Sequence, residues 1–281
     1  MIFVGLKRIL CVCAVALLAA SSQALAQSAQ PSVQALPSHY EVSLKTDLPI
    51  SLLGAFTCIF GNYRVGEMSV PAREDIPKVS RLLPWDRPIA GRYSESADKA
   101  SDYAAVLGLM PLALGGYSWL VGDARGSDFA SYSLMFVEAL ALQSGVNLMV
   151  RSLALWPRPY IYAESGDGAK EALKADGEAY GSFFSGHASA AFTVAVFTGE
   201  WFGEVYPNSP YKSLVWAGSL SAAGLVGVLR IAAGKHYPTD VIVGALAGTG
   251  ISFSIIELHK KTAQRISLWA GLNSAGLTAR F

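Results

Sequence analysis

The sequence predicts an all-helical membrane bundle of five to six core helices that follows a signal peptide. Hydrophobic residues make up 52% of the 281 residues and charged residues 15%, whereas an average soluble domain is about 25% charged. Mean hydropathy is +0.36. Small residues crowd the last apolar runs, as at Gly244, Ala245, Ala247 and Gly248, and such residues let membrane helices pack closely.

Residues 1–26 are predicted to form a secretory signal peptide. Lys7 and Arg8 give the basic end, Ile9–Ala20 the apolar core and Ala24–Ala26 the small-residue cleavage pattern. Twelve apolar residues are few for a helix that needs about 20 to cross a bilayer. Cleavage is therefore favoured over the alternative, an uncleaved membrane anchor.

Charge and cysteine content exclude several classes of protein. The net charge is +1 and there is no long basic run, so nucleic acid is not expected as a partner. Cys11 and Cys13 lie in the leader, and Cys58 is the third cysteine of the chain. A disulfide framework and a cysteine-based zinc site are therefore excluded for the mature chain.

Three further regions are expected: an N-terminal segment at 27–99, a catalytic helical domain at 100–258 and a tail at 259–281. Leu48–Tyr63 carries no charge but has only 16 residues, which is short for a membrane span. We expect an interfacial or half-inserted helix there. Arg64–Lys99 mixes both charges with prolines, which indicates an aqueous or interfacial segment with short helices. The tail is strand-like, and we assign it no function.

Tyr103–Gly122 is uncharged over 20 residues and is the best candidate for a membrane span. Phe129–Val150 follows, interrupted by Glu138, which must face the bundle because a carboxylate facing lipid is unfavourable. Further apolar helices are predicted at Ala188–Phe202, Ser213–Leu229 and Val241–Ile256. Several of these runs have only 15–17 residues, so a buried-core bundle in a soluble secreted protein stays open as an alternative.

Arg151 and Arg158 form the first group of candidate site residues. Because prolines flank Arg158, we expect Arg151 to close the preceding helix and Arg158 to open the loop beside it. Two guanidinium groups placed in this way can converge on one anion with forked hydrogen bonds. The alternative is a pair of cations that cap a helix at the membrane interface.

Ser185, Gly186 and His187 form the second group, directly before an apolar helical run. A serine at the N-cap and a flexible glycine offer a hydroxyl and backbone N–H groups where a helix favours anions. A histidine in the first turn could then donate a proton to a leaving oxygen. The alternative is a histidine with a purely structural hydrogen bond.

Arg230, His236 and Asp240 form the third group. A carboxylate bound to one imidazole nitrogen fixes the tautomer and leaves the other nitrogen to act as a nucleophile. Arg230 would then be a third clamp for a phosphate. A metal site at this histidine would need more ligands, and His39 and His259 are placed too far away, so we expect no metal here.

Together these groups resemble the phosphatidic acid phosphatase type 2 (PAP2) superfamily, whose motifs are K-x6-RP, PSGH and SR-x5-H-x3-D. The resemblance covers roughly residues 100–258 and implies the helical fold shared with haloperoxidases. Arg151, Phe184 and Leu229 stand where the family has lysine, proline and serine. The replacement of lysine by arginine at position 151 bears mostly on one alternative, a vanadate-dependent haloperoxidase, whose similar site has a lysine. The motifs stand here as Arg151-x6-Arg158-Pro159, Phe184-Ser185-Gly186-His187 and Leu229-Arg230-x5-His236-x3-Asp240.

The resemblance implies a metal-independent phosphatase without a cofactor. His236 would attack phosphorus and form a phosphohistidine, and Asp240 would orient it. His187 would protonate the leaving group and then activate water. The phosphate would be held by Arg151, Arg158, Arg230, Ser185 and the Gly186 amide, so that catalysis rests on positioning and electrostatics.

The expected substrate is a phosphorylated membrane lipid: undecaprenyl diphosphate, lipid A phosphate, phosphatidylglycerophosphate or phosphatidate. We expect the bacterial inner membrane with the site facing the periplasm, provided that Leu48–Tyr63 does not cross; if it crosses, the site faces the cytoplasm. One alternative is a soluble periplasmic acid phosphatase of broad specificity. Another is a membrane module that binds phosphate without turnover.

Overall fold

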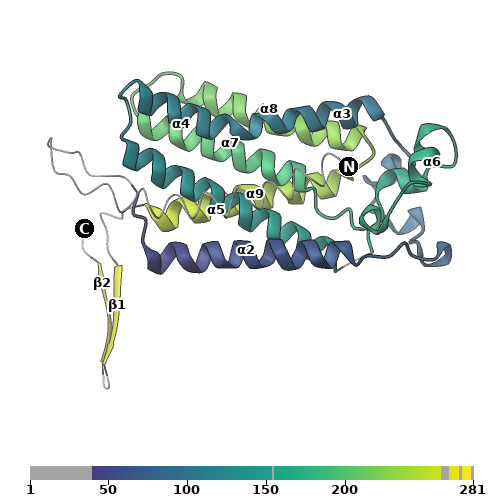
Figure 1. The fold of residues 1–281 in the computed structure, drawn as a ribbon, viewed down its shortest axis with the longest axis horizontal. Coiled ribbons are helices and arrows are strands. Elements are labelled where there is room, and N and C mark those ends of the chain that lie inside the picture. Colours follow the sequence, from purple (N-terminus) through teal and green to yellow (C-terminus); the bar gives the residue numbers. More distant parts are fainter. Residues whose placement is uncertain (1–39, 154, 261–265, 272–273, 280–281) are drawn as a thin grey trace.

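The computed structural model describes residues 40–153, 155–260, 266–271 and 274–279. Long helices lie side by side and form one elongated bundle (Figure 1), which confirms the all-helical prediction. The predicted signal peptide at 1–26 lies outside the described residues. The α-helices are α2 (Leu44–Gly66), α3 (Glu95–Tyr103), α4 (Met110–Leu120), α5 (Gly126–Arg151), α6 (Gly166–Ala172), α7 (Gly186–Val205), α8 (Lys212–Ala232) and α9 (Pro238–His259).

Short elements complete the fold. In the tail, β1 (Ile266–Gly271) pairs with β2 (Ser274–Ala279) as an antiparallel hairpin, with Ile266 opposite Ala279. The loops contain the 3-10 helices η1 (Arg73–Asp75), η2 (Val79–Arg81), η3 (Arg87–Ile89), η4 (Ala104–Leu109), η5 (Pro159–Tyr162) and η6 (Gly177–Tyr180).

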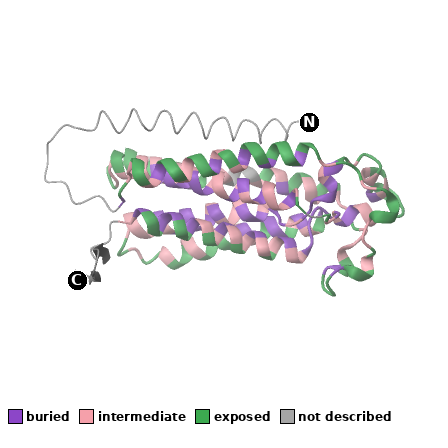
Figure 2. Cartoon of the chain, turned by 90° about the horizontal axis from the view of Figure 1, so that it is seen from below, coloured by how far each residue is buried: buried purple, intermediate pink, exposed green. Residues whose placement is uncertain are grey.

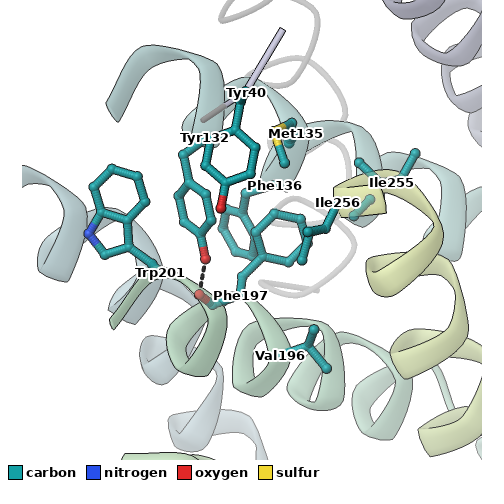
Figure 3. Packing of buried hydrophobic residues seen from close by; sticks show 10 residues of the cluster. Tyr40, Tyr132, Met135, Phe136, Val196, Phe197, Trp201, Ile255 and Ile256 are labelled. Atoms are coloured by element: carbon teal, nitrogen blue, oxygen red, sulfur yellow. Dashed lines mark hydrogen bonds between the residues drawn. The ribbon is translucent and has the colours of Figure 1, made fainter. Parts of the chain in front are cut away.

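The apolar core lies where α5 and α7 meet the end of α9 (Figure 3). Its aromatic rings interlock: Tyr132 lies 4.4 Å from Trp201 and 5.2 Å from Phe197, between ring centroids. The Tyr132 hydroxyl donates a hydrogen bond to the backbone carbonyl of Phe197. A buried tyrosine hydroxyl needs such a partner, so this bond fixes α7 against α5.

Two glycines of α9 allow it to approach the start of α7 closely. A Cβ atom on Gly244 would lie 2.5 Å from the Ser185 carbonyl oxygen, and one on Gly248 would lie 2.1 Å from that of Ser189. Neither distance is possible for a real side chain, so only glycine permits this contact. The predicted small-residue packing therefore holds α9 directly beside the Ser185–Gly186 turn.

Four helices are longer than the apolar runs that predicted them. α2, α5, α8 and α9 have 21 to 26 residues and are long and apolar enough to cross a membrane. The prediction of a short interfacial helix at Leu48–Tyr63 is thus wrong about length, because α2 continues through charged residues at both ends, Asp47 and Arg64. A search for uncharged runs does not detect the first and last turns of a helix when these turns contain charged residues.

The best candidate for a span, Tyr103–Gly122, is not one continuous α-helix. α3 ends at Tyr103, the 3-10 helix η4 follows, and α4 begins at Met110 and has only 11 residues. Pro111 stands in the first turn of α4, where its missing N–H needs no partner. Hydropathy alone does not reveal this change of helix type.

The outer surface of the bundle is apolar. Buried residues line the inner faces of the helices and exposed residues follow their outer faces (Figure 2). Water-soluble monomers rarely expose contiguous apolar patches beyond a few hundred Å². This exposure indicates a membrane protein and argues against the soluble bundle. The exposed apolar side chains include Leu52, Phe56 and Ile59 of α2, Leu214, Leu225 and Val228 of α8, and Ile242 and Leu246 of α9.

The start of α2 and the end of α9 lie at the same end of the bundle. Tyr40, before α2, forms an isolated antiparallel bridge with Lys260, after α9. α5 and α8 end, and α7 and α9 begin, at the opposite end of the bundle (Figure 1). All eight predicted site residues belong to that opposite end.

Candidate active site

Two loops at this end of the bundle are joined by backbone hydrogen bonds. The Trp156 N–H donates to the Tyr180 carbonyl at 2.8 Å, and the Ser182 N–H donates to the Trp156 carbonyl at 2.7 Å. The Arg158 N–H donates to the Ala179 carbonyl at 2.9 Å. These bonds fix the loop after α5, which carries Arg158, against the loop before α7, which carries Ser182.

Arg151 is the last residue of α5, as expected, and is 4% exposed. Its Nε donates to the Gly181 carbonyl at 2.8 Å and its Nη2 to the Glu178 carbonyl at 3.2 Å. Only Nη1 is not used in these bonds. The structure thus shows Arg151 bracing the loop that leads to Ser182, a contact that the forked geometry of arginine makes better than lysine.

Arg158 is the residue that precedes η5, so it opens the loop as expected. Its Nε atom is buried and has no hydrogen-bond partner among the described residues. A buried guanidinium donor without a partner is unfavourable. An anion bound beside Arg158 would satisfy it.

The Ser185–Gly186–His187 turn has the predicted cap. The Ser185 hydroxyl accepts from the Ala188 N–H at 3.3 Å, and the Ser185 N–H donates to the Asp240 carbonyl at 2.9 Å. A Cβ atom on Gly186 would lie 2.8 Å from the Asn147 Oδ1 atom. The turn is therefore fixed to α9 on one side and to α5 on the other, with His187 in the first turn of α7.

His236 and Asp240 meet through a third residue, Ser182. The Ser182 hydroxyl donates to Asp240 Oδ2 at 2.6 Å and lies 3.3 Å from His236 Nδ1. The direct distance from His236 Nδ1 to Asp240 Oδ2 is 3.5 Å. The Tyr237 N–H also donates to Asp240 Oδ2, at 2.9 Å. The carboxylate thus holds the imidazole mainly through Ser182, a residue that the sequence motifs did not indicate.

The environment of His236 keeps its imidazole neutral. Burial lowers its pKa well below the usual range, and the charges of Arg158 and Arg230 lower it further. The electrostatic influence of His187 and Arg151 acts in the same direction. Within the described residues no hydrogen bond engages Nε2. The result is a neutral imidazole that is held at Nδ1 and lies in the field of Arg158 and Arg230.

Comparison with known families decides the identity of this region. Residues 132–263 match the family model described as PAP2 superfamily. This part of the chain belongs to the PAP2 superfamily. The comparisons with curated proteins and with solved structures gave no match. All eight predicted site residues lie within the PAP2 region.

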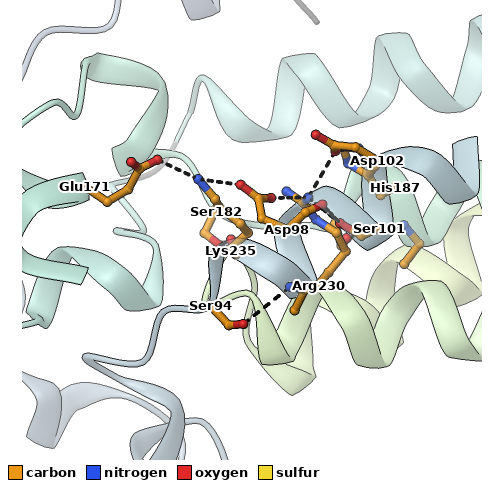
Figure 4. A network of polar contacts seen from close by, with 12 residues as sticks. Ser94, Asp98, Ser101, Asp102, Glu171, Ser182, His187, Arg230 and Lys235 are labelled. Atoms are coloured by element: carbon orange, nitrogen blue, oxygen red, sulfur yellow. Dashed lines mark hydrogen bonds and ion pairs between the residues drawn. The ribbon is translucent and has the colours of Figure 1, made fainter. Parts of the chain in front are cut away.

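Two carboxylates of α3, which precedes the matched region, contact Arg230 and His187 of the candidate site. Arg230 Nη1 donates to Asp98 Oδ1 and to the Ser101 hydroxyl, both at 2.9 Å (Figure 4). Asp102 Oδ1 lies 3.6 Å from the same Nη1 and 3.6 Å from His187 Nε2. Asp102 thus links a predicted phosphate clamp to the predicted proton donor.

Asp102 stays ionised in this position. Burial alone would raise its pKa, but the hydrogen bond from His187 and the charge of Arg230 bring the pKa below its usual value. The spacing of Asp98 and Asp102, four residues apart, puts both on one face of a helix. That spacing was a usable signal, although Asp98 belongs to the segment 64–99 that we expected to be aqueous or interfacial, and Asp102 to the expected catalytic domain.

Lys235 is a further cation of the site that the motifs did not indicate. It is 8% exposed, and its Nζ lies 3.0 Å from Glu171 Oε1 and 3.2 Å from Asp98 Oδ2 (Figure 4). The same Nζ lies 4.7 Å from the centroid of the Tyr160 ring. Lys235 therefore joins α3, α6 and η5 around the rim of the site.

The segment between α2 and α3, here called the strap (residues 67–94), crosses the site loops. Its Gly91 N–H donates to the Pro159 carbonyl at 2.7 Å. The Thr239 N–H donates to Asp86 Oδ1 at 3.1 Å, and the Trp85 ring N–H donates to the Thr239 hydroxyl at 2.7 Å. The strap thus holds the loop after α5 and the start of α9 in one arrangement.

Proposed function

We propose that the protein is a metal-independent phosphatase that hydrolyses a phosphate monoester or diphosphate of a membrane lipid through a phosphohistidine. The observation that carries this proposal is His236: a buried, neutral imidazole that is held at Nδ1 and lies in the electrostatic field of several cationic groups. Mere binding of phosphate would not need an oriented nucleophile. Membership in the PAP2 superfamily supports the phosphatase class.

In the proposed reaction, His236 is the nucleophile and His187 is the general acid and then the general base. Nε2 of His236 attacks phosphorus while the bond to the leaving oxygen breaks, and the His187 imidazole gives that oxygen a proton. Water then attacks the phosphohistidine, His187 takes the proton from water, and the P–N bond breaks. Inorganic phosphate leaves and His236 returns to its neutral form. Asp240, through Ser182, keeps the Nδ1 proton in place during both steps.

Cationic and polar donors would stabilise the phosphoryl oxygens. Arg158 and Arg230 are the main clamps, helped by Arg151, the Ser185 hydroxyl and the Gly186 amide. Both main clamps contain a buried Nε atom without a partner among the described residues. Donors that are fixed before the substrate arrives act most strongly on charge that develops in the transition state.

The proposed substrate is a lipid because of where the site lies. Helices with exposed apolar outer faces end at the site, so a lipid chain can stay in the bilayer while its phosphate reaches His236. Undecaprenyl diphosphate, lipid A phosphate, phosphatidylglycerophosphate and phosphatidate all have this form. The proposal involves no cofactor and no nucleic acid.

We propose the bacterial inner membrane as the location, with the site at the periplasmic face. The length of α2 adds a condition to this orientation. If α2 crosses and the leader carries residue 40 to the periplasm, the site lies at the cytoplasmic face. A periplasmic site together with a crossing α2 requires residues 1–40 to remain inside.

Cysteine labelling decides the orientation. Cys11, Cys13 and Cys58 are replaced by serine, and one cysteine is introduced at Leu173 or at Asn208. Leu173 is 89% exposed and follows α6 beside the site, whereas Asn208 is exposed in the turn between α7 and α8 at the opposite end. In intact spheroplasts, a membrane-impermeant maleimide should label Leu173→Cys and spare Asn208→Cys. The reverse pattern would refute the periplasmic placement.

The function itself is tested by phosphate release from the detergent-purified full-length protein. A panel of the four lipids and soluble esters is assayed with and without EDTA, beside His236→Ala and the surface control Glu257→Gln. We expect release from a lipid that persists in EDTA, requires His236 and is unaffected in the control. Activity confined to soluble esters would support the acid-phosphatase alternative. A folded wild type that is inactive on the whole panel would refute hydrolysis.

A further inference from the structure

A second cluster of chemically reactive side chains lies away from the phosphatase site. Asp47 of α2, Glu138 of α5 and His259 of α9 meet near the end of the bundle where α2 begins and α9 ends. One ligand atom from each residue lies within 4.8 Å of the other two. None of these residues has a role in the proposed phosphatase reaction.

The cluster is buried and closely spaced. His259 is 0% exposed, Glu138 1% and Asp47 7%. His259 Nε2 lies 2.7 Å from Asp47 Oδ1 and 3.7 Å from Glu138 Oε2. Two carboxylates beside one imidazole in an apolar bundle require a positive charge between them, since burying unpaired negative charge is strongly unfavourable.

Outer hydrogen bonds aim the three ligand atoms at one another. His259 Nδ1 lies 2.7 Å from the Ile255 carbonyl oxygen, so Nδ1 carries a hydrogen. Nε2 forms a hydrogen bond with Asp47 Oδ1 at 2.7 Å, and an ion that displaces the shared proton would bind the Nε2 lone pair. Glu138 Oε1 accepts from the Ser51 hydroxyl at 2.8 Å, and Asp47 Oδ2 accepts from the Ser43 N–H. Such outer contacts orient the ligands of protein metal sites.

One oxygen of the cluster points into it without a partner. Glu138 Oε2 is buried and receives no hydrogen bond from any described residue. A buried carboxylate oxygen left in this state calls for a specific explanation, and an ion is among the usual ones. This oxygen is the one that lies toward His259 Nε2.

We propose that Asp47, Glu138 and His259 form a binding site for one divalent first-row transition ion, with zinc or manganese as the matching probes. One imidazole nitrogen and two carboxylate oxygens suit such ions, whose bonds to these atoms are about 2.0–2.2 Å long. Ligand atoms around an ion at that distance are about 3.3–3.5 Å apart. Glu138 Oε2, at 3.7 Å from His259 Nε2, must approach by only about 0.2–0.4 Å, and Asp47 Oδ1, at 2.7 Å, must withdraw by less than about 1 Å.

The ion would join three helices that come from distant parts of the chain. It would neutralise both carboxylates and connect α2, which lies outside the PAP2 region, to α5 and α9. Ligands that bind only the folded state stabilise it by mass action. The ion therefore acts on the docking of α2 and takes no part in phosphoryl transfer.

The test measures metal binding by the full-length protein in detergent, stripped with EDTA and then exchanged into metal-free buffer. Zinc or manganese is added at about 10 µM free ion, and the metal that remains after gel filtration is counted per chain. Glu138→Gln and His259→Gln remove one ligand each. Glu257→Gln, an exposed carboxylate on α9 two residues from His259, is the matched control.

We expect about one ion per wild-type chain and per Glu257→Gln chain, and less than a fifth of that in the two ligand variants. Bound ion should raise Tm by about 5 °C or more. Cobalt should give a visible absorption band in wild type that Glu138→Gln lacks. Wild type that retains no ion, or Glu138→Gln that retains as much as wild type, overturns the proposal. If His259→Gln aggregates, Asp47→Asn and the nearly isosteric Glu138→Gln give the decision.

Discussion

Replacing Ser182 with alanine tests how Asp240 controls His236. The change removes the 2.6 Å hydrogen bond to Asp240 and the 3.3 Å contact with His236 Nδ1. A hydrogen bond to a charged group contributes about 1.5–3 kcal/mol, and about 1.4 kcal/mol corresponds to a tenfold change in rate. Asp240 keeps its bond from the Tyr237 N–H. We therefore expect kcat to fall about 10- to 100-fold, well short of the loss in His236→Ala.

The assay separates positioning of the nucleophile from binding of phosphate. Single-turnover formation of phosphohistidine should slow by the same factor as kcat, while Ki for inorganic phosphate stays within about twofold. Ser189→Ala is the matched control, because Ser189 is also fully buried but its hydroxyl has no partner among the described residues. If kcat of Ser182→Ala stays within about threefold of wild type, or if Ki rises as much as kcat falls, the reasoning about Ser182 is refuted.

Three further predictions concern the clamp, the nucleophile and the helix packing. Arg158→Ala should lower kcat/KM about 10²- to 10³-fold, and Arg158→Lys should restore part of that loss. Equal kcat/KM values for wild type and both variants would contradict the proposed role of Arg158 in binding phosphate. The pKa of His236 in the folded protein lies below its value of about 6.5 in the unfolded chain. Below about pH 6.5 the unfolded chain therefore binds more protons than the folded protein, and the free energy of unfolding falls as the pH decreases. Tm measured between pH 7.5 and 5 should therefore drop more in wild type than in His236→Gln, and parallel curves would disprove this. Gly248→Ala should lower Tm by at least about 2 °C, whereas Gly250→Ala, where a Cβ meets nothing within 4 Å, should not; equal Tm changes would contradict the close contact.

The helices could be predicted because apolar runs directly report the faces that meet lipid or the core. Their ends could not be, since α2 continues through Asp47 and Arg64, and these residues are placed by contacts that only the fold provides. The break at Tyr103–Gly122 escaped prediction for a related reason. A change from 3-10 to α-helix leaves hydropathy unchanged.

The site shows the same division. Motif spacing brought attention to His187, His236 and Asp240, and the structure places His236 within 3.5 Å of Asp240. The motif spacing did not indicate Ser182, which lies 54 residues before His236 in the chain. Contacts between such distant residues depend on how two loops are joined, and no local pattern encodes that.

The strap has a consequence for the order in which the protein is made. Residues 67–94 leave the ribosome before any of the three site loops, and at 5–20 residues per second roughly 7–30 s pass before Asp240 is synthesised. During that interval Trp85 and Asp86 lack Thr239, which they bind in the finished fold. A nascent chain stopped before α9 therefore leaves the ring N–H of Trp85 without the Thr239 hydroxyl, and leaves exposed the Asp86 carboxylate, which is 0% exposed in the finished fold. The candidate active site is completed only when α9 has been synthesised.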